Sequence, residues 1–264
     1  MEKNRENREK FRVKKLFFFI HFLVQIFLII FMGCPYIDNF INTIIKFNQM
    51  NNKIGKQVPK ETYYGKYDDL KRFISYYYQI DLVKKLNPYK ILEIGVGNKT
   101  VSNYLRQNGF NIDTCDFNIN LKPDCVADIR SLPFKNDSYD LLIACEILEH
   151  IPWEDTKIAL NELQRVSKKY VIISVPYSAA CFGLIFNFPL INKTINKPWI
   201  NLSVRIPLFF LKIKFSDQHY WEMGRRGYSL RKVRNIFNKY FEIIEEVSPL
   251  LNSYHHFFLL KKYL

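Results

Sequence analysis

The stretch from Lys90 to Thr100, with the sequence KILEIGVGNKT, constrains the fold more than any other part of the chain. It opens with an apolar run, continues through Glu93, and reaches two glycines, Gly95 and Gly97, with one residue between them. A buried strand that ends in a glycine turn and leads into a helix has this pattern. The glycines leave room for a ligand to approach the backbone, but a tight turn also needs glycine for its geometry alone. Both interpretations remain open from this stretch.

Strand and helix patterns alternate after this turn. Continuous apolar strands separated by helices are typical of a mostly parallel sheet that helices cover on both faces, an α/β fold. The predicted strands are 90–94, 111–115, 124–127, 139–145, 170–175, 241–247 and 256–260. The predicted helices are 68–86, 100–108, 153–168 and a C-terminal helix that begins after the cap Ser229.

Apolar spacing predicts which face of each helix is buried. In the helix 68–86 the expected inner residues are Leu70, Phe73, Ile74, Tyr77 and Ile80. In the helix 100–108 they are Val101 and Leu105, and in the helix 153–168 they are Ile158, Leu163 and Val166.

Acidic residues follow two of the predicted strands in order. Asp116 stands at the end of the second strand, about 20 residues past the glycine turn, where a carboxylate suits a ribose diol. Asp128 could accept a proton from an adenine amino group while Ile129 packs on the ring. A dinucleotide-binding turn needs a third glycine, and Thr100 occupies that position here. A ligand without a phosphate therefore fits the turn better.

These residues together resemble a known family. The segment ILEIGVG at 91–97 resembles the first motif of the class I S-adenosylmethionine-dependent methyltransferases, and Asp116 matches their ribose acid. The segment 127–140, ADIRSLPFKNDSYD, is similar to their adenine-site segment. The segment LEHI at 148–151 is similar to that of the type-11, ubiquinone-methyltransferase-like subgroup. The resemblance covers residues 85–177 and, more loosely, the two final strands; it implies a Rossmann-like, doubly wound sheet of seven strands.

The resemblance also implies roles for particular residues. Those expected along S-adenosylmethionine are Glu93, Gly95 and Gly97 for the methionine and ribose, Asp116 for the ribose, Asp128 and Ile129 for the adenine, and Cys145 and Glu146 beside the sulfonium. Lys99 and Thr100 depart from the small residues that the family often has there.

The acceptor side is less defined by the sequence. A methyl sulfonium is already activated, so a base is needed only if the acceptor holds a proton at neutral pH. His150 is the first candidate for that base and His219 the second, while His150 could instead brace its loop. Tyr177, Trp221 and Glu222 are candidate substrate residues, although Trp221 could simply pack the returning chain.

The cysteine pattern predicts no metal site. The five cysteines are an odd number and contain no CxxC pair, which argues against a zinc site and against a disulfide framework. A reducing compartment fits this cysteine pattern best.

Charge and hydropathy divide the rest of the chain. Residues 1–15 form a basic tail, 16–33 an apolar helix that could anchor or lie on a membrane, and 34–67 a connector. The domain at 68–264 contains an apolar, basic insert at 179–215, which is expected to cover the acceptor pocket. Residues 1–60 have a net charge of +7 and the insert has +5, out of +14 for the chain. Basic and apolar segments together favour a membrane surface over nucleic acid, for which no binding motif is present.

The leading hypothesis is methyl transfer from S-adenosylmethionine to a small, lipid-like or lipid-linked acceptor, by a cytoplasmic protein associated with a membrane through its N-terminal apolar helix. A nicotinamide-dependent reductase on a related fold is one alternative, and a catalytically silent membrane-bound scaffold is another. The sequence does not predict an oligomeric state.

Overall fold

The computed structural model describes residue 63 and the ranges 67–188, 200–212 and 218–263. The chain divides into two compact units, 1–54 and 55–264, and every described residue belongs to the second. The predicted basic tail, the apolar helix 16–33 and most of the connector lie outside the described residues. No helix in the described ranges is long and apolar enough to cross a membrane.

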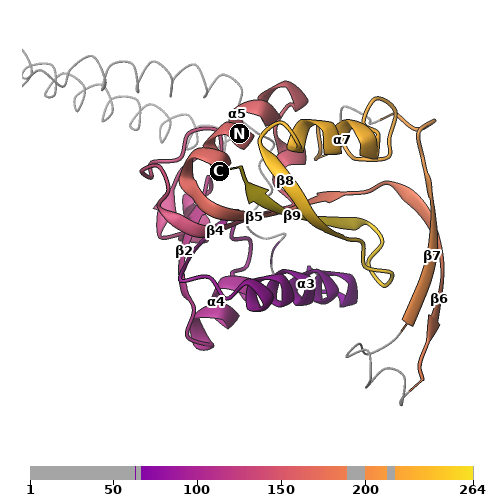
Figure 1. The fold of residues 1–264 in the computed structure, drawn as a ribbon, viewed down its shortest axis with the longest axis horizontal. Coiled ribbons are helices and arrows are strands. Elements are labelled where there is room, and N and C mark those ends of the chain that lie inside the picture. Colours follow the sequence, from indigo (N-terminus) through magenta and orange to yellow (C-terminus); the bar gives the residue numbers. More distant parts are fainter. Residues whose placement is uncertain (1–62, 64–66, 189–199, 213–217, 264) are drawn as a thin grey trace, which may run out of the picture. The chain divides into compact units, whose positions relative to one another are not determined.

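A seven-stranded sheet forms the centre of the second unit (Figure 1). Its strands lie in the order β3-β2-β1-β4-β5-β9-β8, and β3, β2, β1, β4 and β5 are parallel. Only β9 runs antiparallel to its neighbours β5 and β8. The strands are β1 (Lys90–Ile94), β2 (Asn111–Asp116), β3 (Cys125–Val126), β4 (Tyr139–Cys145), β5 (Ser167–Pro176), β8 (Phe241–Val247) and β9 (His255–Lys262). The predicted doubly wound, mostly parallel sheet is confirmed, and its order reverses between β1 and β4.

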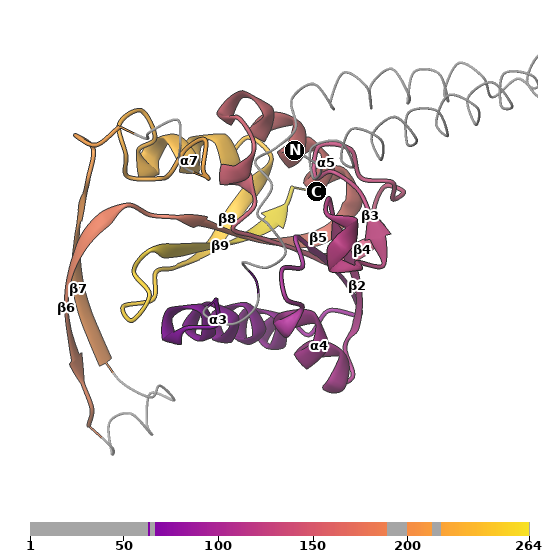
Figure 2. The same cartoon turned by 180° about the vertical axis from the view of Figure 1, so that it is seen from behind.

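Helices cover both faces of this sheet (Figures 1 and 2). Helices α3 (Leu70–Leu86) and α4 (Thr100–Gln107) lie on one face, and α5 (Thr156–Val166) and α7 (Leu230–Phe237) on the other. Because successive side chains of a strand point to opposite faces, each strand serves two cores. In β1, Ile91 packs with α3 and α4, whereas Leu92 packs with α5 and α7.

The predicted inner face of α3 is wrong for three of its five residues, while Ile74 is partly buried and Ile80 packs against the core. Leu70, Phe73 and Tyr77 are 72%, 54% and 55% exposed. The buried face instead carries Ser75, Tyr76, Gln79, Leu82 and Val83. Its polar members have partners, which makes their burial tolerable: Gln79 donates to Ser75, Tyr76 donates to Asp68, and Ser75 bonds to His255 of β9.

A smaller error of the same kind occurs in α5. Ile158 is 47% exposed, while Leu163 and Val166 are buried as predicted. The buried pair Val101 and Leu105 of α4 confirms the prediction for that helix.

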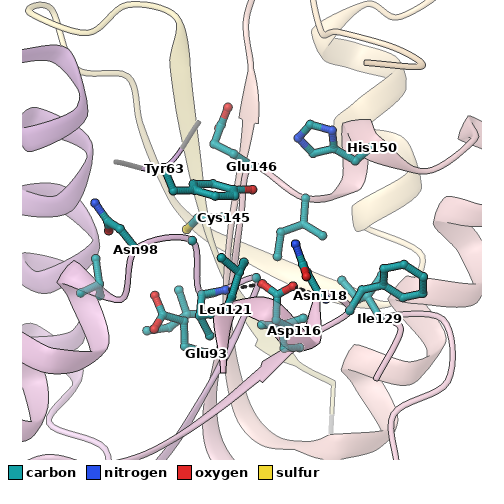
Figure 3. A pocket seen from close by; sticks show the side chains of 18 of the residues that line it. Tyr63, Glu93, Asn98, Asp116, Asn118, Leu121, Ile129, Cys145, Glu146 and His150 are labelled. Carbon is teal, nitrogen blue, oxygen red and sulfur yellow. Dashed lines mark hydrogen bonds between the residues drawn. The ribbon is translucent and has the colours of Figure 1, made fainter. Parts of the chain in front are cut away.

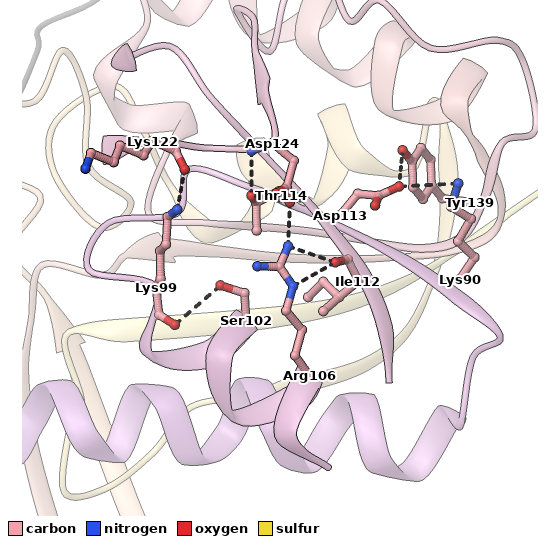
Figure 4. Close-up of polar contacts among 10 residues, drawn as sticks. All are labelled: Lys90, Lys99, Ser102, Arg106, Ile112, Asp113, Thr114, Lys122, Asp124 and Tyr139. Carbon is pink, nitrogen blue, oxygen red and sulfur yellow. Dashed lines mark hydrogen bonds and ion pairs between the residues drawn. The ribbon is translucent and has the colours of Figure 1, made fainter. Parts of the chain in front are cut away.

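Polar contacts fasten α4 to the outer strands (Figure 4). Arg106 of α4 donates two hydrogen bonds to the carbonyl oxygen of Ile112 and pairs with Asp124. Asp124 in turn accepts hydrogen bonds from the backbone and the hydroxyl of Thr114 in β2. The helix that begins at the glycine turn is therefore held against β2, whose last residue is Asp116.

The insert forms a separate two-stranded sheet. Strand β6 (Ala179–Phe186) pairs antiparallel with β7 (Ile200–Pro207), and the hairpin projects beside the main sheet (Figure 1). Many of its apolar side chains are exposed, including Phe182, Leu184, Leu202, Val204 and Ile206.

Candidate active site

A cavity of about 270 Å³ opens at the carboxyl ends of β1, β2 and β4, where the strand order reverses. Crevices at this position bind ligands in open α/β sheets. Figure 3 shows the labelled side chains around one space, with Glu93 and Asp116 at one end and Glu146 and His150 at the other. The lining includes every residue predicted for the cofactor and both candidate catalytic histidines: Glu93, Gly95, Gly97, Asp116, Asp128, Ile129, Cys145, Glu146, His150 and His219.

The two glycines of the turn have different roles, and each role matches one of the interpretations that the sequence left open: turn geometry and room for a ligand. Gly95 has a φ of +80°, and a Cβ there would lie 2.5 Å from the Cδ1 atom of Ile147, so packing requires glycine. Gly97 has a φ of +49°, but a Cβ there would meet only the ring of Tyr63, at 3.4 Å. Gly95 is thus needed for geometry, whereas Gly97 keeps the backbone open beside the cavity.

Asp116 both organises the turn and faces the cavity. Its Oδ2 atom accepts a hydrogen bond of 2.9 Å from the backbone of Val96, and its Oδ1 atom accepts one of 2.7 Å from the backbone of Asn118 (Figure 3). Burial raises the pKa of Asp116, and these two hydrogen bonds counteract that rise. Each carboxylate oxygen has a second lone pair, so the group can still accept hydrogen bonds from a ligand diol.

Glu93 is a buried carboxyl at the floor of the cavity. It is 5% exposed, and its Oε2 atom has no hydrogen-bond partner among the residues that the structure describes. Burial raises the pKa of Glu93 to about 7, against the opposing effects of Ser102 and Arg106. An unsatisfied acceptor here suits a positively charged ligand group such as an ammonium.

The ionised form of Glu93 should therefore lower the free energy of unfolding when the cavity is empty. Its pKa in the folded state, about 7, lies above the ordinary 4.5, so its favourable contribution is complete below pH 4.5 and is lost as the pH rises through 7. We expect Glu93→Gln to raise the free energy of unfolding by about 2–3 kcal/mol near pH 8 and to change it little at low pH. Urea unfolding of the ligand-free protein at both pH values measures this difference. Glu154→Gln, at an exposed site, is the control; equal effects of the two variants would contradict the prediction.

The Asp128 carboxylate is held in place by Arg130. Its Oδ1 and Oδ2 atoms accept hydrogen bonds from the guanidinium, which also pairs with Asp155 at 2.7 Å. Ile129 between them is 4% exposed and lines the cavity. The pair fixes the orientation of Asp128, which lines the cavity.

The end of β4 adds a second carboxylate. Glu146 has a φ of +56°, a conformation that non-glycine residues rarely adopt and that is often found at functional sites. Its Oε1 atom accepts a hydrogen bond of 2.9 Å from Ser174, and its Oε2 atom lies 3.5 Å from the Nε2 atom of His255. Strands β5 and β9 therefore hold this side chain beside Cys145.

The segment 218–222 is fastened to the turn that contains Glu149 and His150. The backbone N–H group of Tyr220 donates to the backbone carbonyl oxygen of Glu149 at 2.7 Å. The indole of Trp221 donates to the carbonyl oxygen of Leu148 at 3.0 Å. The Nδ1 atom of His150 lies 3.2 Å from the carbonyl oxygen of Gln218. As a result the rings of His150 and His219 lie edge to face, with centroids 5.0 Å apart.

The three predicted substrate residues do not line this cavity. Trp221 is fully buried and packs against Trp153, with ring centroids 4.8 Å apart, because it belongs to the core under the returning chain. Tyr177 is 5% exposed and its backbone bonds to Tyr254. Glu222 accepts hydrogen bonds from several neighbours and supports His219. The described part of the insert likewise contributes no lining residue, which differs from the expected pocket cover.

Glu222 is a buried ionic centre. It bonds to the Nδ1 atom of His219 at 2.9 Å, to Tyr254 at 3.0 Å and to Arg225 at 2.6 Å, and also to Ser178. Burial by itself would raise its pKa, but the hydrogen bonds from His219, Ser178 and Arg225 outweigh burial and bring the pKa to about 2. The group is ionised at neutral pH and orients the His219 ring.

Sequence reasoning missed the lining residues that come from distant segments. Tyr63 and Tyr67 belong to the predicted connector, Arg72 to α3, and Tyr254 and His255 to the start of β9. For Tyr63 and Tyr67, the sequence offered only the presence of tyrosines in the predicted connector. For Tyr254 and His255, spacing along the chain could not show that the start of β9 lies near the glycine turn.

The comparisons with known proteins agree with this site. Residues 92–175 match the family model described as a methyltransferase domain, and this range runs from β1 through β5. No curated protein matches the chain. The match favours a methyltransferase over the nicotinamide-dependent reductase.

Similar solved structures include three methyltransferases. Magnesium protoporphyrin IX methyltransferase from Synechocystis, with bound SAH, is 14% identical and has a TM-score of 0.49, over 74% of this chain and 84% of that one. N-methyltransferase NodS from Bradyrhizobium japonicum, in complex with S-adenosyl-l-homocysteine, is 10% identical with a TM-score of 0.44, over 75% and 90%. The 1,6-didemethyltoxoflavin-N1-methyltransferase from Burkholderia thailandensis is 11% identical with a TM-score of 0.47, over 75% and 80%.

The matched domain contains the glycine turn, both strand-end acids and the turn with Glu149 and His150. Its strands belong to the mostly parallel seven-stranded sheet that the sequence motifs implied. Residues 92–175, which carry these groups, therefore match a methyltransferase domain.

Proposed function

We propose that this protein transfers the methyl group of S-adenosylmethionine to a small acceptor. The observation that carries the proposal is the single cavity in which the glycine turn, Asp116, Asp128 and Glu93 are collected at one end. These groups match the parts of the cofactor in order: diol acceptor, adenine partner, and a buried carboxyl for the ammonium.

The residues perform binding and alignment more than bond chemistry. Asp116 would accept hydrogen bonds from the two ribose hydroxyls, and Glu93 would face the methionine ammonium. Cys145 and Glu146, at the end of β4, would border the sulfonium, so that an acceptor entering beside His150 meets the methyl group in line. Positioning of this kind and exclusion of water supply most of the rate enhancement when the transferred group is already activated.

Calorimetric titration of the full chain with S-adenosylhomocysteine tests the proposal. We expect stoichiometric binding, and we expect no fluorescence change when NADH is titrated under the same conditions. Binding of NADH without binding of S-adenosylhomocysteine would overturn the proposal.

We further propose that the acceptor is lipid-like or lipid-linked and that the protein works on a cytoplasmic membrane surface. The hairpin β6–β7 supports this, because Phe182, Leu184, Leu202 and Val204 are each 63–65% exposed. Adjacent exposed apolar side chains of this kind are uncommon on monomeric soluble proteins. The insert around them has a net charge of +5, which suits anionic lipid headgroups.

The hairpin variant Phe182→Ser/Val204→Ser should weaken binding to anionic vesicles. Removing two large exposed apolar side chains should lower vesicle partitioning roughly tenfold. Sedimentation of the full chain with vesicles of phosphatidylcholine and phosphatidylserine measures the effect. Leu70→Ser/Phe73→Ser, on the exposed face of α3, is the matched control. If both double variants sediment like the wild type, the hairpin does not dock on lipid.

A further inference from the structure

Two imidazoles and one carboxylate converge at the acceptor end of the cavity. The ligand atoms of Glu149, His150 and His219 all lie within 4.8 Å of one another, and the Nε2 atom of His150 lies 4.0 Å from the Oε1 atom of Glu149. All three residues line the cavity opposite the glycine turn. The cysteine pattern, from which no metal was expected, does not bear on ligands of this type.

The hydrogen bonds of the two histidines determine which ring nitrogens can act as ligands. His150 faces the carbonyl oxygen of Gln218 through Nδ1, and a carbonyl oxygen can only accept, so Nδ1 carries the proton. His219 faces the ionised Glu222 through Nδ1, which places its proton there too. In the neutral rings the lone pair is then on Nε2 of each. Metal-ligating histidines are commonly oriented by such a carbonyl or carboxylate partner.

Glu149 supplies an independent observation. Its side chain is fully buried, and neither Oε1 nor Oε2 has a hydrogen-bond partner in the described ranges of the chain. A buried carboxyl without partners is costly unless a ligand or cation satisfies it. The polar cluster therefore contains one acceptor that the protein leaves for something else.

The supporting contacts hold the three residues in this arrangement. The hydrogen bonds from the backbone of Tyr220 to the carbonyl oxygen of Glu149 and from Trp221 to Leu148 connect the segment that carries His219 to the turn that carries the other two. Arg225 and Tyr254 hold Glu222, which in turn holds His219. A site whose ligands are oriented by fixed second residues loses little freedom when it binds a metal.

We propose that Glu149, His150 and His219 bind a divalent transition-metal cation of the zinc type. Imidazole ligands favour this class of cation over Mg²⁺ or Ca²⁺, and two histidines with one glutamate leave a coordination position open. Bonds of about 2.0–2.2 Å require ligand atoms closer together than 4.0–4.8 Å, so the side chains close by about 1 Å on binding.

The open position faces the same cavity, and this role rests on the proposed methyl transfer. A hydroxyl of the acceptor held there would lose its proton to bulk water more easily, because a bound cation stabilises the oxyanion. The oxygen would then form a bond to the methyl carbon as the carbon–sulfur bond of S-adenosylmethionine breaks and S-adenosylhomocysteine leaves. The acceptor atom is then an oxygen, and His150 and His219 act as ligands in place of a general base.

The test uses the full chain, freed of metal with a chelator and titrated calorimetrically with ZnCl₂. We expect stoichiometric binding in the wild type, and binding weakened by about 100-fold or more in Glu149→Gln and in His219→Gln. His21→Gln, outside the described residues, is the matched control and should bind as the wild type does. S-adenosylhomocysteine binding by the same samples should persist, which shows that the variants are folded.

Each outcome separates the two proposals. Equal Zn²⁺ affinity of the wild type and of His150→Ala/His219→Ala, with S-adenosylhomocysteine binding intact, overturns the metal site and leaves the methyltransferase function standing. If the wild type does not bind S-adenosylhomocysteine, the proposed methyl transfer is overturned, while the Zn²⁺ titration still tests the metal site. With Co²⁺ as the probe, weak visible bands support nitrogen and oxygen ligands, and an intense thiolate charge-transfer band overturns them.

The acceptor chemistry has its own readout. Nitrocatechol, a chromophoric oxygen chelator, should shift to its metal-bound spectrum when added to Zn²⁺-loaded wild type after removal of free metal. An unshifted spectrum with metal still bound would overturn the oxygen acceptor.

Discussion

Asp116→Asn should weaken S-adenosylhomocysteine binding by about 100-fold or more. The substitution keeps the size of the side chain but removes the charge and one of the two acceptor oxygens. Hydrogen bonds to a charged group contribute about 1.5–3 kcal/mol each, and each 1.4 kcal/mol is a factor of ten in affinity. Asp116 now accepts hydrogen bonds from the backbone N–H groups of Val96 and Asn118. The NH₂ group of an asparagine would face one of these two donors and could not accept its hydrogen bond.

Asp113→Asn is the matched control for this experiment. Asp113 lies on the same strand, β2, but accepts from Tyr139 and pairs with Lys90 away from the cavity (Figure 4). Calorimetry should show unchanged affinity in this variant. An Asp116→Asn affinity within a factor of a few of the wild type would mean that the diol does not bind at the end of β2.

Trp221→Ala should lower the free energy of unfolding by about 3–5 kcal/mol, the range for removing a fully buried large aromatic side chain. Trp221 is 0% exposed and makes an edge contact with Trp153 and a tilted one with Tyr228. The variant also leaves the Leu148 carbonyl oxygen without its indole donor, directly before Glu149 and His150. Urea unfolding followed by far-ultraviolet circular dichroism measures the loss.

Trp221→Phe distinguishes packing from hydrogen bonding. It keeps most of the aromatic volume and loses the N–H group, so we expect a loss of about 1–2 kcal/mol. A small loss in both variants would contradict the assignment of Trp221 to the core and would favour the substrate role that the sequence suggested.

Local pattern was sufficient for the elements of the sheet and for the cofactor end of the site. Continuous apolar runs locate buried parallel strands, because both faces of such strands are covered. The acids Asp116 and Asp128 were predictable because each follows a strand, and the carboxyl ends of parallel strands meet at the same edge of the sheet.

The buried face of α3 shows where pattern fails. Apolar spacing favoured Leu70, Phe73 and Tyr77, but the helix buries Ser75 and Gln79 instead. A hydrogen bond between Ser75 and His255 of β9, about 180 residues away in the chain, and one from Gln79 to Ser75 lower the cost of burying these polar groups. A periodicity calculated within one helix contains no information about such a partner.

The sequence by itself determined the alternation of strands and helices, the glycine turn and the acids at the strand ends, because these depend on neighbours along the chain. Only the tertiary structure decided the acceptor end. It brought His219 beside Glu149 and His150, moved Trp221 into the core and set Tyr63 over Gly97. Those relations depend on how a loop after the hairpin and a segment before α3 pack on the sheet, and packing between distant segments leaves no periodic trace in the chain.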